Sequence, residues 1–287
     1  MSLNQRIQEF YDASSGLWEE VWGEHLHHGY YGINGRERKE RCQAQIDLIE
    51  ELLAWGQVQE PKEILDVGCG IGGSSLYLAQ KYQAKTTGIT LSPVQASRAK
   101  NRAEIQGLAA QTTFLVADAL EMPFVDNSFD LVWSLESAEH FPDKQKFLQE
   151  AYRVLKPGGL LLMATWCHRP IVPATGELTK EEQKHLAEIY RVYCLPPVIS
   201  IPEYKNLAVG TNFQNIHTAD WSSEVAPFWD AVIASAFSEE AVIGLLQSLW
   251  QQKWQAIEGA LVLGLMRSGY QRSLIRYGLL CGTKGIY

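Results

Sequence analysis

One stretch of ten residues, from Ile64 to Gly73, restricts most strongly the folds that this chain can adopt. A short apolar run there ends at Asp66, and three glycines follow at alternate positions: Gly68, Gly70 and Gly72. The apolar run fits a buried strand of a parallel sheet, and the glycines allow a turn in which the backbone approaches a ligand more closely than a Cβ atom would permit. The helix predicted over about 73–82 directs its first N–H groups toward whatever lies above that turn.

Two cofactors bind to a strand, glycine turn and helix of this kind. A dinucleotide site has the spacing G-x-G-x-x-G, whereas the spacing here is G-x-G-x-G with an acid before the first glycine. A carboxylate at Asp66 would repel a pyrophosphate but could pair with the ammonium of an amino-acid group. The pattern therefore favours S-adenosylmethionine, with a glycine turn that binds nothing as the alternative. It resembles the first motif of the class I, seven-stranded methyltransferases, which assigns to the cofactor Asp66, Gly68, Cys69, Gly70 and Gly72.

Strand and helix signals alternate after this motif. The predicted strands are 85–90, 112–117, 129–135 and 160–166, with later ones near 213–221 and 273–281, and the predicted helices are 36–55, 73–82, 93–107, 143–155 and 180–193. Alternation of this kind indicates a doubly wound parallel sheet. The class I resemblance implies an α/β, Rossmann-like methyltransferase fold with seven mostly parallel strands, an antiparallel last strand and helical lid insertions.

The chain divides into three parts on this prediction. Residues 1–35 form an N-terminal lid, 36–168 form the S-adenosylmethionine-binding core, and 169–287 hold the remaining core strands. Two helical insertions, about 169–211 and 222–269, interrupt the last part. Both leave from the carboxyl edge of the sheet, where open α/β sheets bind ligands, so we expect them to cover the substrate.

The N-terminal lid is rich in aromatic and histidine side chains. We interpret this density as a cover over the cofactor, but for Phe10, Trp18 and Trp22 we favour the alternative, a helix that is merely packed down on the protein. Three histidines follow, at His25, His27 and His28, but no second cluster of ligands accompanies them, so no metal site is predicted.

The second insertion carries large apolar side chains from Phe228 to Met266, more than a small lid needs for its own core. This excess indicates an apolar substrate or an entrance that faces a membrane. Packing against the sheet or against a dimer partner explains it as well. The sequence leaves both explanations and the oligomeric state open.

Composition restricts the partners and the compartment that we expect for this protein. The formal net charge is −8, and the densest basic run, 36–41, is interrupted by acids, so no nucleic-acid partner is expected. The five cysteines are scattered without C-x-x-C spacing, which indicates a reducing compartment. Neither a signal peptide nor an apolar run of about eighteen residues is visible, so we expect a cytoplasmic or organellar protein, with peripheral membrane contact where an apolar substrate requires it.

The remaining cofactor contacts depart from the usual superfamily pattern at one point. The second strand runs into 88–95 without the acid that binds the ribose hydroxyls in most of the superfamily, and we assign Thr90, Leu91 and Gln95 as substitutes. Asp118 and Ala119 after the third strand fit an adenine contact, in which a carboxylate accepts from the exocyclic amine; a plain loop cap at Asp118 is the alternative. Ser134, in the fourth strand, completes the predicted cofactor set.

A pair at the end of the fourth strand, Glu139 and His140, resembles the pair found there in small-molecule methyltransferases. Together with other segments it resembles the tocopherol C-methyltransferases, the γ-tocopherol enzymes in particular, over effectively the whole chain. The segments that carry this resemblance are Phe10–Trp18, Trp22–Gly32, Gly88–Gln95, Ala164–Pro170, Asp220–Trp221 and Ala226–Trp229. Ala138 and Phe141 depart from the family pattern.

The resemblance implies methylation of a chromanol ring carbon beside the phenolic hydroxyl, with a small hydrophobic phenol as substrate. Free phenols ionise near pH 10, and loss of the proton places negative charge on the adjacent carbon. An imidazole of near-neutral pKa suits the base, so His140 is the predicted base, with Glu139 or Glu136 as its orienting partner. Tyr11 and His28 are second choices, and a histidine that is merely hydrogen-bonded beyond a strand is the alternative for His140.

Three other functions remain as alternatives. The nearest is N-methylation of a hydrophobic amine on the same scaffold. A nicotinamide-dependent oxidoreductase is disfavoured by the acid before Gly68 and by the missing acid near position 90. A non-catalytic S-adenosylmethionine sensor is disfavoured by the aromatic lid and by Glu139 and His140.

Overall fold

The computed structural model describes residues 2–236 and 263–286, and within 14, 16–22, 235 and 236 it describes the backbone alone. In this part of the chain seven strands form one sheet in the order β3-β2-β1-β4-β5-β7-β6. Their bounds are β1 Glu63–Val67, β2 Lys85–Thr90, β3 Thr112–Val116, β4 Phe129–Leu135, β5 Leu155–His168, β6 Gln214–Asp220 and β7 Ile275–Thr283. Only β7 runs antiparallel to its neighbours, β5 and β6. The predicted doubly wound, mostly parallel sheet is confirmed.

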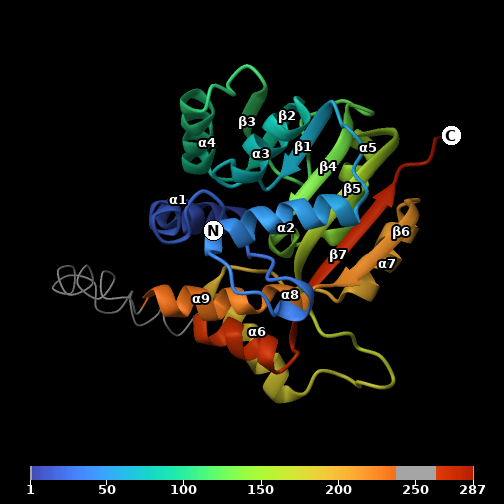
Figure 1. The fold of residues 1–287 in the computed structure, drawn as a ribbon. Helices are drawn as coiled ribbons and strands as arrows, with labels where there is room; N and C mark the ends of the chain where they lie inside the picture. Colours follow the sequence, from blue (N-terminus) through green and yellow to red (C-terminus); the bar gives the residue numbers. More distant parts are fainter. Residues whose placement is uncertain (1, 237–262, 287) are drawn as a thin grey trace.

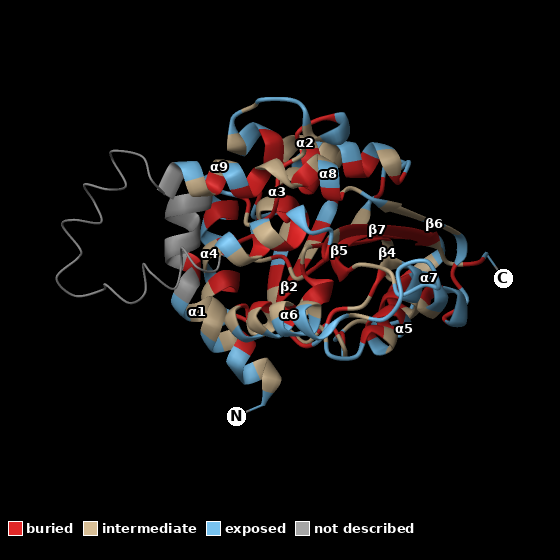
Figure 2. Cartoon of the chain, turned by 90° about the horizontal axis from the view of Figure 1, so that it is seen from below, coloured by how far each residue is buried: buried red, intermediate tan, exposed pale blue. Residues whose placement is uncertain are grey.

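Helices cover both faces of the sheet (Figure 1). Their bounds are α1 Leu3–Trp22, α2 Arg41–Trp55, α3 Gly73–Tyr82, α4 Pro93–Ile105, α5 Lys144–Val154, α6 Lys180–Val192, α7 Ile201–Gly210, α8 Ser222–Val225 and α9 Pro227–Ala236, and residues 263–271 are also helical. One apolar cluster includes α2, α6 and α9, and another includes α5 and α7. In Figure 2 the buried, red segments lie along central strands such as β5 and β7 and on parts of the helices, whereas pale blue, exposed segments are frequent at the periphery.

Local capping explains where the elements begin. The predicted helix 36–55 starts only at Arg41, because the Glu40 side chain accepts from the backbone N–H of Gln43 and caps it. The side chains of Thr179 and Glu182 form a capping box at the start of α6. Strand β5 extends beyond the predicted 160–166 at both ends, because Leu155 pairs with Phe129 of β4 and the pairing with β7 continues to His168.

The described part of the second insertion packs into the core. Phe228, Trp229, Val232 and Met266 are buried in the same cluster as α2 and the sheet. These four side chains therefore fit the core explanation of the apolar excess, and the members within 237–262 lie outside the described residues. None of the described helices has the length and apolar character that crossing a membrane requires.

Candidate active site

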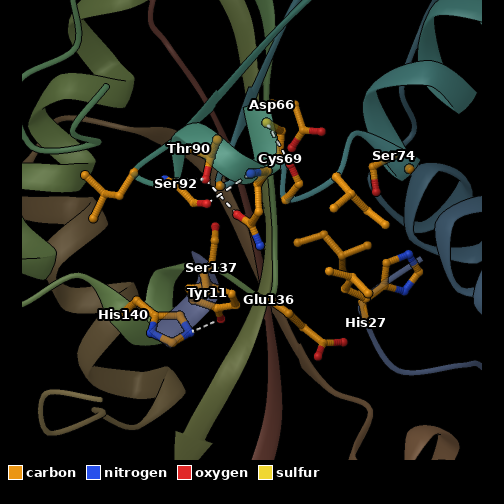
Figure 3. A pocket seen from close by; sticks show the side chains of 18 of the residues that line it. Tyr11, His27, Asp66, Cys69, Ser74, Thr90, Ser92, Glu136, Ser137 and His140 are labelled. Carbon is orange, nitrogen blue, oxygen red and sulfur yellow. Dashed lines mark hydrogen bonds between the residues drawn. The ribbon is translucent and has the colours of Figure 1, made fainter. Parts of the chain in front are cut away.

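A cavity lies at the carboxyl ends of β1, β2 and β4, and we call it the main cavity. Its walls come from α1 through Ile7 and Tyr11, from the segment 24–27, and from the loops that follow the three strands. Figure 3 shows Asp66 and Cys69 on one side of this space, with Glu136 and His140 on the other. The topology places these loops together, as the position of the glycine motif predicts.

The glycine turn has the backbone that its sequence requires. Gly68, Gly70 and Gly72 have φ values of 81°, 53° and 86°, in the left-handed region that favours glycine. A Cβ atom on Gly68 would lie 2.2 Å from the Cβ atom of Ser137. Gly68, Cys69 and Gly70 line the main cavity, whereas Gly72 lies against Ala99 and Phe114 and begins α3.

Asp66 lies at the base of the main cavity. It is 2% exposed, and its Oδ2 accepts a hydrogen bond of 2.6 Å from Ser75 Oγ. Burial raises its pKa to about 7, because charging a carboxylate away from water is costly. A cationic ligand group would offset that cost, so Asp66 fits the predicted role as partner of an ammonium.

The predicted ribose and adenine positions lie along one side. Thr90 Oγ1 donates to Gln95 Oε1 over 2.8 Å, and both residues line the main cavity with Leu91. Asp118 and Ala119 line a neighbouring space, which we call the side cavity. There Asn4 of α1 donates to Asp118 Oδ2 over 2.7 Å, so the N-terminal helix reaches the predicted adenine position.

Ser134 lies behind the cavity wall. It is fully buried, and its hydroxyl is 2.8 Å from Ser137 Oγ, which in turn donates to the carbonyl of Val67. Leu135, Glu136 and Ser137 form the wall itself. The structure therefore gives Ser134 a supporting contact in place of a direct one.

A third space adjoins the main cavity, and we call it the inner cavity. Its lining residues are Phe10, Tyr11, Leu26, Glu136, Glu139, His140, Trp166 and Tyr193. Tyr11, Leu26, Glu136 and His140 also line the main cavity. Among the described residues, His140 alone lines the main, side and inner cavities.

His140 is held by the N-terminal helix. It ends a short 3-10 turn after β4, Ala138–His140, and its Nε2 is 2.7 Å from the Tyr11 hydroxyl. Burial, followed by the nearby charge of Lys144, lowers its pKa to about 3. The expectation that the pKa of His140 lies near neutrality is therefore wrong, because it assumes a ring in contact with water. His140 is a neutral imidazole at physiological pH.

Glu136 is the centre of a dense hydrogen-bond network. Its Oε1 accepts from the backbone N–H of His28 at 2.7 Å and from the Tyr277 hydroxyl at 2.8 Å. Its Oε2 lies 2.7 Å from His28 Nδ1 and 3.2 Å from Trp166 Nε1. Burial alone would raise the pKa of Glu136, but the contributions of His28 outweigh it and lower that pKa. Glu136 thus remains a buried carboxylate.

Glu139 has a different partner from the predicted one. It is 1% exposed, and its Oε2 accepts from Thr165 Oγ1 over 2.7 Å. Burial, together with the neighbouring charge of Glu136, raises its pKa to about 8. The structure corrects the predicted orienting role of the two glutamates, since the hydrogen-bond partner of His140 is Tyr11.

Several lining residues escaped the sequence analysis. His25 and His27 line the main cavity, and burial lowers the pKa of both rings, that of His25 to about 3. Their sequence signal was the histidine-rich segment, which we had considered only as a lid or a metal site. Tyr193 had no signal beyond its place at the end of a predicted helix. Over the described ranges, no three His, Cys, Asp or Glu side chains gather in a way that could hold a metal ion.

Comparison with known proteins places these features in context. Residues 65–163 match a family model described as a methyltransferase domain. Over 292 residues the chain is 46% identical to the chloroplastic tocopherol O-methyltransferase of Arabidopsis thaliana, covering 99% of this chain and 83% of that protein. It is 33% identical over 294 residues to ajmaline N-methyltransferase of Rauvolfia serpentina, covering 99% of each. A solved structure from Galdieria sulphuraria, assigned as a sarcosine dimethylglycine methyltransferase, matches with a TM-score of 0.80 at 26% identity, covering 96% of this chain and 99% of that one.

Proposed function

Because this chain belongs to the tocopherol methyltransferase family, we propose that it transfers a methyl group from S-adenosylmethionine to a tocopherol ring carbon beside the phenolic hydroxyl. The expected conversions are γ-tocopherol to α-tocopherol and δ-tocopherol to β-tocopherol. The name of the Arabidopsis relative specifies an O-methyltransferase, so methylation of the phenolic oxygen is the competing outcome. The observation that carries the proposal is the position of His140, in the wall shared by the three cavities.

The residues of the main and side cavities fit S-adenosylmethionine. Asp66 offers a buried carboxylate to the ammonium group, and Asp118 offers an acceptor to the adenine amine. The turn from Gly68 to Gly72 lets the backbone come close, and Thr90 and Gln95 provide polar groups for the ribose. When bound, this cofactor supplies an electrophilic methyl group.

In this proposal His140 accepts the phenolic proton. A ring whose pKa is about 3 is neutral and can accept a proton, but it is too weak a base to ionise a free phenol in advance. Once the ring carbon gains the methyl group, the hydroxyl becomes far more acidic and a weak base suffices. We therefore infer that the phenolic proton leaves during or after methyl transfer, which gives a dienone. The methylated ring carbon then loses its hydrogen as a proton and the oxygen regains one, so the phenol is restored and the net reaction releases one proton. Tyr11 orients the imidazole for the loss of the phenolic proton.

Glu136 provides the negative charge of the site. Glu136 lines both the main and the inner cavity. Its carboxylate therefore lies near the positive charge both before the methyl transfer, when the cofactor carries it, and afterwards, when the acceptor carries it. Fixed charges of this kind stabilise a transition state strongly because they need no reorganisation. Glu139, whose pKa of about 8 leaves it mostly protonated at pH 7, adds little opposing charge.

A hydrophobic amine is the second candidate acceptor, because the chain is also 33% identical to an N-methyltransferase. An amine is nucleophilic once it has lost its proton, so it needs a base less than a phenol does. Substitution of His140 should then matter little at high pH.

The test is a single-turnover reaction with S-adenosylmethionine and an equimolar mixture of γ-tocopherol, δ-tocopherol and a hydrophobic secondary amine. Mass spectrometry counts the methyl groups on each acceptor, and NMR distinguishes a new ring methyl from a methyl ether. We expect α- and β-tocopherol with a matching amount of S-adenosylhomocysteine. A methyl ether would move the reaction to the oxygen, and methylated amine alone would replace the tocopherol proposal.

We further propose that the protein meets its acceptor at a membrane surface, since a tocopherol carries a long apolar tail. Co-sedimentation with liposomes that contain γ-tocopherol tests this point. Equal recovery in the supernatant with and without liposomes would contradict it.

A further inference from the structure

Tyr193 lines the inner cavity, and the proposed function leaves its buried hydroxyl unexplained. Tyr193 follows α6, is 6% exposed, and packs its ring edge-on against Trp166 with a centroid distance of 5.2 Å. It lines the inner cavity, and its hydroxyl is buried without a hydrogen-bond partner among the described residues. Such a group costs free energy in a folded protein, because it has lost its water and gained nothing in exchange.

Most of the neighbouring polar groups are engaged with one another, and His140 Nδ1 is the other buried polar atom of this wall without a partner among the described residues. Tyr11 is hydrogen-bonded to His140, Glu139 accepts from Thr165, and Glu136 is held by His28, Trp166 and Tyr277. These hydrogen bonds hold the cavity wall without any contribution from the Tyr193 hydroxyl. A ligand hydroxyl in the inner cavity would complete the one group on the wall whose side-chain oxygen is left over.

We propose that Tyr193 binds the acceptor, by donating a hydrogen bond from its hydroxyl to the phenolic oxygen of the tocopherol head group in the inner cavity. This inference rests on the proposed function and adds the contact that recognises the acceptor as a phenol. Burial raises the pKa of Tyr193 above its usual value, so the side chain keeps its proton and acts as a donor. The phenolic oxygen would then accept from Tyr193 while its own proton is directed to His140.

The arrangement also gives selectivity. An acceptor without a hydroxyl leaves the Tyr193 donor buried and unpaired, which a site built around that donor disfavours. A hydrophobic amine that lacks a suitable oxygen meets the same penalty. Tyr193 thus distinguishes phenolic acceptors from apolar molecules of the same shape.

The experiment compares the binding of α-tocopherol with that of its 6-deoxy analogue, which lacks the hydroxyl, in the presence of S-adenosylhomocysteine. Dissociation constants from tryptophan fluorescence are measured for the wild type, Tyr193→Phe and Tyr190→Phe. Tyr190 is the control, because it lies near Tyr193 in the last turn of α6, packs against the core and does not line the inner cavity. We expect the preference for the hydroxylated ligand to fall about five- to tenfold in Tyr193→Phe and to stay unchanged in Tyr190→Phe.

Two further readouts separate binding from folding. The melting temperature of Tyr193→Phe should equal or exceed that of the wild type, since the substitution removes a buried unpaired hydroxyl. Its affinity for S-adenosylhomocysteine alone should not change. If the wild type methylates tocopherols and Tyr193→Phe keeps the full preference for the hydroxyl, this inference is wrong while the proposed function stands. If the wild type neither methylates nor binds tocopherols, both fail.

Discussion

Replacing Glu136 by glutamine should destabilise the protein far more than its small change in shape suggests. A glutamine has one acceptor oxygen where the carboxylate has two. If that oxygen takes the Oε1 position, the indole N–H of Trp166 faces an NH₂ group. If it takes the Oε2 position, the backbone N–H of His28 faces the NH₂ group instead. Neither donor can reverse its role, so one buried donor is left unpaired in either arrangement.

The size of the effect follows from these bonds. An unpaired buried donor costs about 1–3 kcal/mol, and the loss of charge from the remaining hydrogen bonds costs about 1 kcal/mol more. We therefore expect the free energy of unfolding to fall by about 2–4 kcal/mol, which corresponds to a melting temperature lower by roughly 5–10 °C. The difference should be present above the ordinary pKa of a glutamate, near 4.5, and should be lost as pH falls through the lowered pKa of folded Glu136.

Urea unfolding at pH 7 measures this loss, and Glu139→Gln is the matched control. Glu139 is equally buried but is mostly protonated at that pH and accepts one side-chain hydrogen bond, from Thr165. Its substitution should cost less than about 1 kcal/mol. Equal stability of the two variants would refute the reasoning about unpaired donors.

Three further predictions concern the reaction and the cofactor. His140→Ala should lower kcat about 100-fold or more while leaving the affinity for S-adenosylhomocysteine little changed, and an unchanged kcat would remove His140 from the mechanism. The pKa of Asp66 is raised to about 7, so its carboxylate becomes available to an ammonium group only as pH rises. The affinity for S-adenosylmethionine, measured by calorimetry, should therefore increase about tenfold per pH unit from pH 5.5 toward 7. Asp66→Asn should flatten that dependence. Gly68→Ala should lower the melting temperature and weaken cofactor binding at least tenfold, since φ is 81° and the new Cβ atom would meet Ser137; near-wild-type values for both would show that the turn can relax.

The fold could be predicted because its signals are local. The glycine motif, the alternation of elements, and the capping residues Ser92 and Thr179 each lie within a few residues of what they determine. The predicted family is confirmed by relatives at 46% identity. Element ends were less accurate where a side chain decided them, as Glu40 does for α2.

The contacts within the site could be predicted only in part, because they join residues that are far apart in the sequence. Tyr277 reaches Glu136 across 141 positions, and Tyr11 reaches His140 across 129. The low pKa of His140 depends on how completely the surrounding elements exclude water, which no short motif encodes. The adjacency of Glu139 and His140 was likewise misleading, since on a 3-10 turn the two side chains take different partners.

Helix α1 contributes to the wall of each cavity, through Asn4 in the side cavity, Ile7 in the main cavity and Phe10 in the inner cavity, with Tyr11 shared by the last two. If cofactor and acceptor bind as proposed, both contact one helix. The second ligand should then bind more tightly, because the first already holds α1 in place. Thermodynamic linkage requires the same factor in either order of addition: S-adenosylhomocysteine should strengthen tocopherol binding as much as tocopherol strengthens the binding of S-adenosylhomocysteine.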